Sequence, residues 1–347
     1  MFAPAYMGRK RIFQMLSLDW LNMGEDVMTF RCAILDDYQD CALGFADWAS
    51  LHDVEVKNFT HPITTTDELA EQLAEFEIIV AMRERTRFDA ALFARLPHLK
   101  LLITTGMRNA AIDLTAAATR GVTVCGTRSL PNPAPELTWG LLLALARQIP
   151  AEVAAVREGN WQTQMGLGLS GKTLGIVGLG KIGSQIARYA QAFDMPVLAW
   201  SRNLTDEQCQ SVGVERARSL YALLQRADVV TLHLVLSDST RGIIGARELG
   251  LMKPTALLVN TSRGPLIDEA ALLQTLTQNR IAGAALDVFD TEPLPASHPL
   301  RSLPNVVVTP HIGYVCRENY ELFYGDAVED IQAWLRGSPV RTLPEPK

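Results

Sequence analysis

The chain has 347 residues, of which 48% are hydrophobic and 20% charged, and its formal net charge is −6. This is the composition of an ordinary soluble globular protein, and the length predicts two domains of roughly 100–200 residues each. The negative charge gives no electrostatic reason to expect a nucleic acid or a membrane surface as partner.

Cysteine usage limits the compartment and the kinds of site. The five cysteines form an odd, scattered set without a C-x-x-C pair: Cys32, Cys41, Cys125, Cys209 and Cys316. Such a set is typical of a reducing cytoplasm and argues against a disulfide framework and a zinc site, so we expect a cytoplasmic protein and no metal.

Two segments could be mistaken for membrane or targeting elements. Residues 1–28 contain three basic residues but no apolar run after them, so they do not resemble a secretory signal. We interpret them as a loosely ordered extension, or as the product of an upstream start codon assigned by mistake. The apolar run Leu137–Ala146 is about half the ~20 residues that a bilayer span needs, and therefore predicts a buried helix.

Short apolar runs alternate with helical patterns along the first part of the chain, which predicts a parallel sheet with crossover helices. The predicted helices are Thr66–Glu75 and Asp89–Leu96, and the predicted strands are Arg31–Leu35, Glu77–Met82, Lys100–Thr104 and Val122–Cys125. The segment Leu130–Pro135 (LPNPAP) then predicts a hinge, with Pro135 in the first turn of a helix capped near Asn132 or Ala134.

A second series of six strands follows, as many as a dinucleotide-binding sheet requires. The predicted strands are Thr173–Gly178, Pro196–Trp200, Asp228–Leu234, Ala256–Thr261, Gly283–Phe289 and Val306–Thr309. The chain ends with a predicted amphipathic helix from Glu318 to Arg336, which Gly337 and Pro339 stop. Periodicity alone leaves open whether this helix packs on the first domain.

The first strand of the second series leads into a G-x-G-x-x-G motif made by Gly178, Gly180 and Gly183. The motif follows an apolar strand and opens a helix that begins with Lys181 and Ile182, which is the context of dinucleotide binding. The three glycines permit a tight turn, a close approach of the pyrophosphate, and contact between helix and strand, while the helix N-terminus attracts the phosphates.

The next strand ends in AWSRN, where an acidic residue is expected to bind the ribose hydroxyls of NAD. Ser201 and Arg202 stand there instead. A guanidinium beside a hydroxyl suits a 2′-phosphate, so the cofactor is predicted to be NAD(P) with NADP(H) favoured. Alternatively, Arg202 is a solvated loop residue that stacks on adenine.

Three polar residues follow later strands: Arg263 in VNTSRGPLIDE, Glu292 in ALDVFDTEP and His311 in VVVTPHIG. Ligands of open α/β sheets bind outside the carboxyl ends of the strands, so these side chains are expected to face one crevice. Singly, they could be a loop cation, a turn carboxylate and a capping or core histidine. Together they supply what reduction of a keto acid needs, namely a cation for the carboxylate and a proton donor held by a carboxylate partner.

The motifs GLGKIG, NTSRG, ALDVF-x-x-EP and TPHIG resemble, in order and spacing, those of the D-isomer-specific 2-hydroxyacid dehydrogenase family. The likeness covers about residues 30–336. It implies an α/β protein with two doubly wound parallel sheets, in which a Rossmann-type dinucleotide-binding domain (130–315) is inserted into a flavodoxin-like substrate domain (29–129 and 316–347). It also implies an enzyme that transfers a hydride between NAD(P)H and a small 2-keto acid, forming a D-2-hydroxy acid.

The resemblance assigns a role to each matching position. Arg263 would bind the substrate carboxylate and carbonyl, and His311 would be the acid–base catalyst with Glu292 as its partner. The other implied contacts are Thr261 and Asp287 for the cofactor, Arg83, Met107 and Arg108 for the substrate, and the arm at residues 136–161 for a homodimer. Arg108 is unusual in its loop, so it is either an extra cation facing the substrate or an outward-pointing arginine. Tyr314 either closes the pocket or starts the last helix.

The resemblance leaves other functions open. Formate oxidation uses the same architecture, but the enzymes concerned have a glutamine where this chain has Glu292. A nucleotide-sensing binding protein, similar to the corepressors of this fold, is an alternative that only a measurement of turnover excludes. The substrate also stays open: glyoxylate, hydroxypyruvate, phosphoglycerate (as in a serine-pathway dehydrogenase) and bulkier keto acids are all possible, because no motif fixes the contacts of the substrate side chain.

Overall fold

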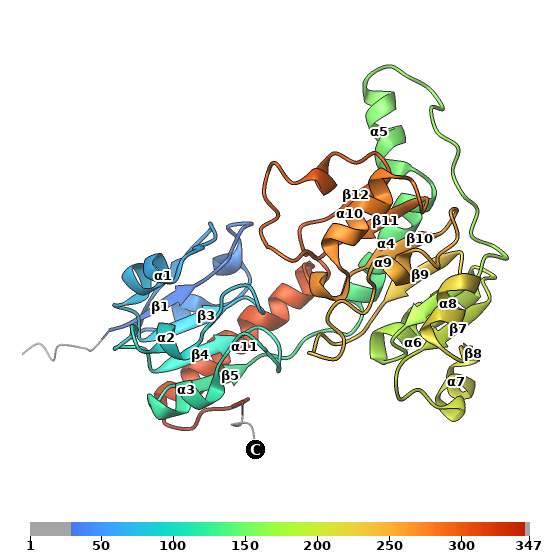
Figure 1. The fold of residues 1–347 in the computed structure, drawn as a ribbon. Coiled ribbons are helices and arrows are strands. Elements are labelled where there is room, and N and C mark those ends of the chain that lie inside the picture. The colour runs from blue at the N-terminus through green and yellow to red at the C-terminus, as the bar shows by residue number, and fades with distance from the viewer. Residues whose placement is uncertain (1–28, 344–347) are drawn as a thin grey trace, which may run out of the picture.

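The computed structural model describes residues 29–343, so the interpretation of residues 1–28 as a loose extension lies outside the described residues. Two lobes are joined by two chain crossings, and each lobe has a parallel sheet at its centre (Figure 1). The predicted fold class, α/β with two parallel sheets, is confirmed. We keep the domain limits proposed from the sequence, 29–129 with 316–347 and 130–315, because the two sheets are compatible with them.

The first sheet has five parallel strands in the order β2-β1-β3-β4-β5, the flavodoxin-like order. Its strands are β1 (Phe30–Ile34), β2 (Val54–Asn58), β3 (Ile78–Ala81), β4 (Leu101–Thr104) and β5 (Thr123–Gly126). Its helices are η1 (Ala42–Gly44), η2 (Trp48–Ser50), α1 (Thr66–Leu73), α2 (Ala90–Phe93) and α3 (Leu114–Thr119). The inner strands β3 and β4 are buried along their whole length, as expected of a parallel sheet covered on both faces.

The second sheet has seven parallel strands in the order β12-β11-β10-β9-β6-β7-β8. Its strands are β6 (Leu174–Val177), β7 (Val197–Trp200), β8 (Glu215–Arg216), β9 (Val229–Leu232), β10 (Leu257–Asn260), β11 (Gly283–Leu286) and β12 (Val306–Val308). Its helices are α6 (Lys181–Ala192), α7 (Asp206–Val212), α8 (Leu220–Arg226), α9 (Ala246–Leu249), η3 (Gly264–Leu266), α10 (Glu269–Thr277) and η4 (Pro299–Arg301). The chain reverses its direction across the sheet beside β6, the position at which such sheets bind nucleotides.

Two strands were missed by the sequence prediction. The strand β2 has the mixed burial of a sheet edge and includes a lysine and an asparagine, so its apolar alternation is weak. The strand β8 has two exposed residues and no apolar signal at all. The prediction of six strands in the second sheet was therefore wrong by one, and several predicted strands and helices were one to three residues too long.

The last helix, α11 (Arg317–Leu335), returns from the second lobe to the first sheet (Figure 1). Its buried residues Phe323, Tyr324 and Ile331 pack with Cys32 and Ile34 of β1 in one core cluster. This answers the question that periodicity left open, because the helix covers one face of the first sheet. The two ends of the described chain therefore build one core.

The first crossing between the lobes leads into α4 (Pro133–Ala146), whose N-cap is Asn132. The cap agrees with one of the two predicted positions, and Pro135 lies in the first turn as predicted, with Pro133 at the first helical position. The helix α5 (Ile149–Arg157) follows and projects from the second lobe as an arm (Figure 1). Within residues 29–343, no single helix meets the length and hydropathy of a membrane span, and α4 with α5 meets them only as a pair bent by 61°.

Candidate active site

The three residues singled out as catalytic follow three neighbouring strands of the second sheet. Arg263 comes three residues after β10, Glu292 lies in the loop after β11, and His311 lies in the loop after β12. These strands are adjacent and parallel, so their loops leave the same edge of the sheet. That edge of the second sheet faces the first lobe (Figure 1).

His311 and Glu292 form a hydrogen-bonded pair. The Nδ1 atom of His311 lies 2.5 Å from Oε2 of Glu292, whose Oε1 accepts from the backbone N–H of Phe289 at 2.9 Å. Burial works to raise the pKa of Glu292, but the hydrogen bond and charge of His311 outweigh it and lower this pKa. An ionised Glu292 fixes the imidazole with Nδ1–H toward the carboxylate, which directs Nε2 away from it.

Asp287 holds the loop that carries His311 through three hydrogen bonds. One oxygen of Asp287 accepts from Thr309 Oγ1 at 2.6 Å and from the N–H of Ile312 at 2.8 Å. The other accepts from the N–H of Gly313 at 2.8 Å, and burial raises the pKa of this carboxyl. His311 itself has a φ of 55°, an unusual conformation for a residue with a side chain, so the loop is fixed in a strained shape. Contact of Asp287 with the cofactor stays a prediction.

Arg263 reaches across to the first lobe. Its Nη1 donates to the backbone carbonyl of Ser262 at 2.6 Å, and its Nη2 forms an ion pair with Glu84, which follows β3. The backbone carbonyl of Arg263 accepts from Asn260 Nδ2 at 2.8 Å, which fixes the turn after β10. The sequence reasoning assigned Arg263 but missed Glu84, because a pair 179 residues apart leaves no local signal.

The other cation of the first-lobe loop, Arg83, lies beside this pair. Its Nη1 donates to the carbonyl of Thr105 at 3.3 Å, and burial together with the charge of Arg263 lowers its pKa. Gly106, with a φ of 98°, makes room for this side chain, since a Cβ there would lie 2.1 Å from Nη1 of Arg83. Contact of Arg83 with a substrate stays a prediction.

The remaining substrate-loop residues of the prediction are exposed. Met107 is 44% exposed, and Arg108 is exposed and has no ion pair within the described part of the chain. Both alternatives for Arg108, an extra cation facing the substrate and an outward-pointing arginine, stay open. Whether either residue meets a substrate stays a prediction.

Arg85 was not assigned a side-chain role from the sequence, yet it contacts Tyr314 and the His311 loop. Arg85 donates from Nε to the hydroxyl of Tyr314 at 2.5 Å and from Nη2 to the carbonyl of His311 at 3.0 Å. Its guanidinium also lies 5.0 Å from the ring centroid of Tyr38. Tyr314 precedes α11, which begins at Arg317, so the interpretation that Tyr314 starts the last helix was wrong.

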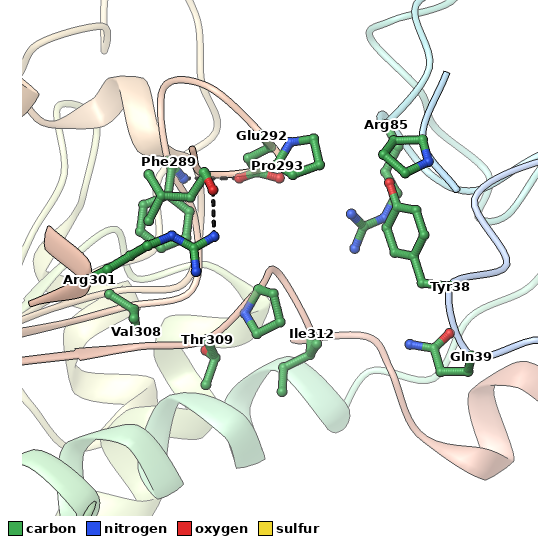
Figure 2. Close-up of a pocket in the computed structure, with 13 residues that line it drawn as sticks. Tyr38, Gln39, Arg85, Phe289, Glu292, Pro293, Arg301, Val308, Thr309 and Ile312 are labelled. Carbon is green, nitrogen blue, oxygen red and sulfur yellow. Dashed lines mark hydrogen bonds between the residues drawn. The ribbon is translucent and has the colours of Figure 1, made fainter. Parts of the chain in front are cut away.

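A cavity of about 590 Å³ between the two lobes lies beside the hydrogen-bonded pair of His311 and Glu292 (Figure 2). Glu292 and Pro293 border it, Tyr38 and Arg85 form one side, and Phe289, Arg301 and Val308 form the other. The guanidinium of Arg301 is used by the carbonyls of Leu294 and Pro295. The cavity is therefore mostly apolar, and it reaches Glu292 rather than His311 or Arg263.

The glycine motif has the geometry of a phosphate-binding turn. Gly178 has a φ of 108°, and a Cβ on Gly183 would lie 2.1 Å from the carbonyl of Gly178, so neither position accepts a side chain. Gly180 caps α6 and has no atom within 4 Å of its Cβ position, which leaves open space where a pyrophosphate would approach. Lys181 and Ile182 form the first turn of α6. These residues fit a dinucleotide.

The other predicted cofactor residues surround the same edge of the sheet. Ser201 and Arg202 follow β7, and Nη2 of the exposed Arg202 donates to the carbonyl of Ser239 at 3.1 Å. Thr261 follows β10, and its hydroxyl lies 2.6 Å from that of Thr138 in α4. Their contacts with a cofactor stay predictions.

Two further histidines, His233 and His298, make contacts outside the candidate site. Burial lowers the pKa of His233 to about 3, and its Nε2 lies 2.8 Å from the hydroxyl of Thr231. His298 caps η4 and pairs with Glu269 at 3.1 Å. Within residues 29–343, no group of three or more His, Cys, Asp or Glu side chains could hold a metal ion.

The chain is similar to known proteins over most of its length. Residues 139–313 match the family described as D-isomer specific 2-hydroxyacid dehydrogenase, NAD binding domain. The chain is 39% identical over 261 residues to a glyoxylate reductase of Aeropyrum pernix, which covers 72% of this chain and 78% of that protein.

Two further similarities involve phosphoglycerate enzymes. A D-3-phosphoglycerate dehydrogenase of Methanocaldococcus jannaschii is 38% identical over 276 residues, or 79% of this chain and 52% of that protein. The chain thus spans about half the length of that relative. The crystal structure of a phosphoglycerate oxidoreductase of Vibrio cholerae superposes with a TM-score of 0.85 at 38% identity, over 89% of this chain and 100% of that one.

Proposed function

The chain belongs to the D-isomer-specific 2-hydroxyacid dehydrogenase family, and from this premise we propose that it reduces a 2-keto acid to the D-2-hydroxy acid with a nicotinamide cofactor. The observation that carries the proposal is the pair of His311 and Glu292, set at the edge of the sheet from which Arg263 also projects. Reduction of a carbonyl needs a proton donor at the oxygen, and this pair supplies one.

Each residue of the proposed site has one task. Arg263 binds the substrate carboxylate through its planar guanidinium and polarises the carbonyl. His311, held by ionised Glu292, gives the proton on Nε2 to the carbonyl oxygen as the alcohol forms, and takes it back in the reverse reaction. A bound reduced nicotinamide would supply the hydride to the carbonyl carbon. The glycine turn and the start of α6 would hold its pyrophosphate.

We favour NADP(H) as the cofactor. The support is the sequence after β7, where Ser201 and Arg202 replace the acidic residue that would accept from the ribose hydroxyls. Arg202 is exposed, and within residues 29–343 its guanidinium is engaged only with the carbonyl of Ser239, so its other N–H groups remain available to a 2′-phosphate.

We also propose a homodimer formed through the arm at residues 136–161. Its support is the exposure of large apolar side chains there, with Ile149, Val153 and Val156 each more than two-fifths exposed and Trp161 78% exposed. Apolar surface of this kind is typical of subunit contacts. A cytoplasmic location is consistent with five free cysteines in the described part of the chain.

The decisive experiment is turnover. The purified protein would be mixed with NADH or NADPH and a panel of 2-keto acids, and oxidation of the cofactor followed by its absorbance. Consumption that depends on a keto acid, with a D-2-hydroxy acid as the chiral product, supports the proposal. Cofactor binding without turnover of any keto acid would contradict it and favour the nucleotide-sensing alternative.

A further inference from the structure

Glu84 has no role in the proposed function. Its carboxylate nevertheless forms an ion pair with the guanidinium of Arg263, to which the substrate carboxylate would bind. The side chains of Glu84 and Arg263 are only 25% and 33% exposed, so water screens this ion pair incompletely. The second oxygen of Glu84 lies 3.5 Å from the N–H of Ala110. Glu84 is therefore a partly buried negative charge at the proposed substrate site rather than a surface charge.

Glu84 lies between two cations. Arg83 and Arg263 are close enough for each to act on the other, and Glu84 acts on both. Arg85 donates to the hydroxyl of Tyr314 and the carbonyl of His311 rather than to Glu84. The carboxylate of Glu84 therefore offsets one of the two positive charges of Arg83 and Arg263.

A carboxylate paired with Arg263 reduces the positive charge that this part of the site offers to a substrate. A substrate with a second anionic group, such as a phosphate or a second carboxylate, would meet the uncompensated repulsion of Glu84 at short range. We propose that Glu84 is a specificity-determining residue, which makes this site select 2-keto acids whose carboxylate is their only negative charge. The inference rests on the proposed function and names the charge class of its substrate.

The inference separates the chain from part of its relatives. Glyoxylate, in the name of one relative, carries one carboxylate, whereas phosphoglycerate, in the names of two others, also carries a phosphate. Sequence identity to these proteins is nearly equal, at 39% and 38%, so identity does not decide between the two classes. The negative charge of Glu84 beside Arg263 instead favours the substrates with a single carboxylate.

The first test is a ratio of specificity constants. The value of kcat/KM would be measured for glyoxylate and hydroxypyruvate, with one negative charge, and for 3-phosphohydroxypyruvate and 2-oxoglutarate, with more. The wild type is expected to prefer the first pair. Glu84→Gln should shift the ratio toward the second pair by about tenfold, since it removes one nearby charge. Glu84→Asp keeps the charge and should retain the preference.

The matched control is Glu75→Gln, which removes a carboxylate of the same lobe that is 70% exposed and pairs with Arg31. It should leave the ratio unchanged. A ratio that Glu84→Gln does not move, or a wild type that prefers the multiply charged substrates, would overturn the inference while leaving the dehydrogenase function intact.

The second test does not need turnover. Oxamate and oxalate have nearly the same shape and differ by one charge, and their binding to the complex with the reduced cofactor can be followed by nicotinamide fluorescence. The wild type should bind oxamate more tightly than oxalate. Glu84→Gln should reduce or reverse this difference in affinity. If no keto acid is reduced, the proposed function fails, but this comparison of affinities still tests the role of Glu84. An equal reduction of the affinity difference in Glu75→Gln would contradict that role.

Discussion

Nη2 of Arg85 donates to the backbone carbonyl of His311 across 3.0 Å, which joins a loop of the first lobe to the residue proposed as proton donor in the second. Nε of the same guanidinium donates to Tyr314, three residues further along that loop. Asp287 holds the loop from the second lobe. The position of His311 is therefore fixed from both lobes at once.

Arg85→Lys should lower kcat by about ten- to a hundredfold, because an ammonium lacks the planar donor pair that reaches Tyr314 and His311, and small displacements of an acid–base group are costly. Cofactor binding should stay unchanged, since the glycine turn lies elsewhere. The matched control is Arg87→Lys, on the same loop but exposed and paired with Asp89. Steady-state kinetics measure both, and an equal effect of the two variants would remove the positioning role from Arg85.

His311→Ala should depress kcat by about 10²–10⁴-fold, because it removes the proton donor, while reduced cofactor still binds as shown by its fluorescence. The protein provides a control with a similar contact outside the site, namely His298, which pairs with Glu269 at 3.1 Å. His298→Ala should keep kcat within a few-fold of the wild type. Turnover of His311→Ala at that same level would assign the proton donor elsewhere.

Arg263→Lys should cause a large loss in kcat/KM for keto acids. The lysine keeps the charge but loses the planar, two-pronged donor that matches a carboxylate. The Michaelis constant of the reduced cofactor should hardly change. An unaltered kcat/KM would transfer carboxylate binding to Arg83 or Arg108.

The core of this fold could be predicted because apolar strands and the motifs that follow them are local sequence patterns. The glycine turn and the three residues after β10, β11 and β12 could be found because buried strands and their following motifs are local. Glu84 and Arg85 could not be found in this way, since their partners lie 179 and 226 residues along the chain. Edge strands were missed for another reason: β2 and β8 bury too little to need an apolar pattern.

Asp330 predicts how stability depends on pH. Its side chain is fully buried in α11 beside Arg341, and burial raises its pKa to about 7. The folded state then keeps a proton that the unfolded chain releases, so stability should fall as pH rises from about 4 to 7. Asp330→Asn should flatten this part of the curve of Tm against pH. Glu329→Gln, an exposed partner of the same arginine, should not, and parallel curves for all three proteins would contradict the assignment.

The proposed preference for NADPH rests on Arg202, whose exposed guanidinium lies after β7 where an acid would favour NADH. If it binds the 2′-phosphate, Arg202→Ala should weaken NADPH by about 1.5–3 kcal/mol, the value of a charge-assisted hydrogen bond, and leave NADH nearly unchanged. Ser201→Asp should go further and favour NADH, because a carboxylate accepts from the ribose hydroxyls and repels the phosphate. The measurement is the ratio of kcat/KM for the two reduced cofactors in the wild type and both variants. Arg218→Ala, in the exposed segment after β8, is the control and should leave this ratio unchanged. A wild type that prefers NADH, with a ratio indifferent to Arg202→Ala, would leave Arg202 as the loop residue that stacks on adenine.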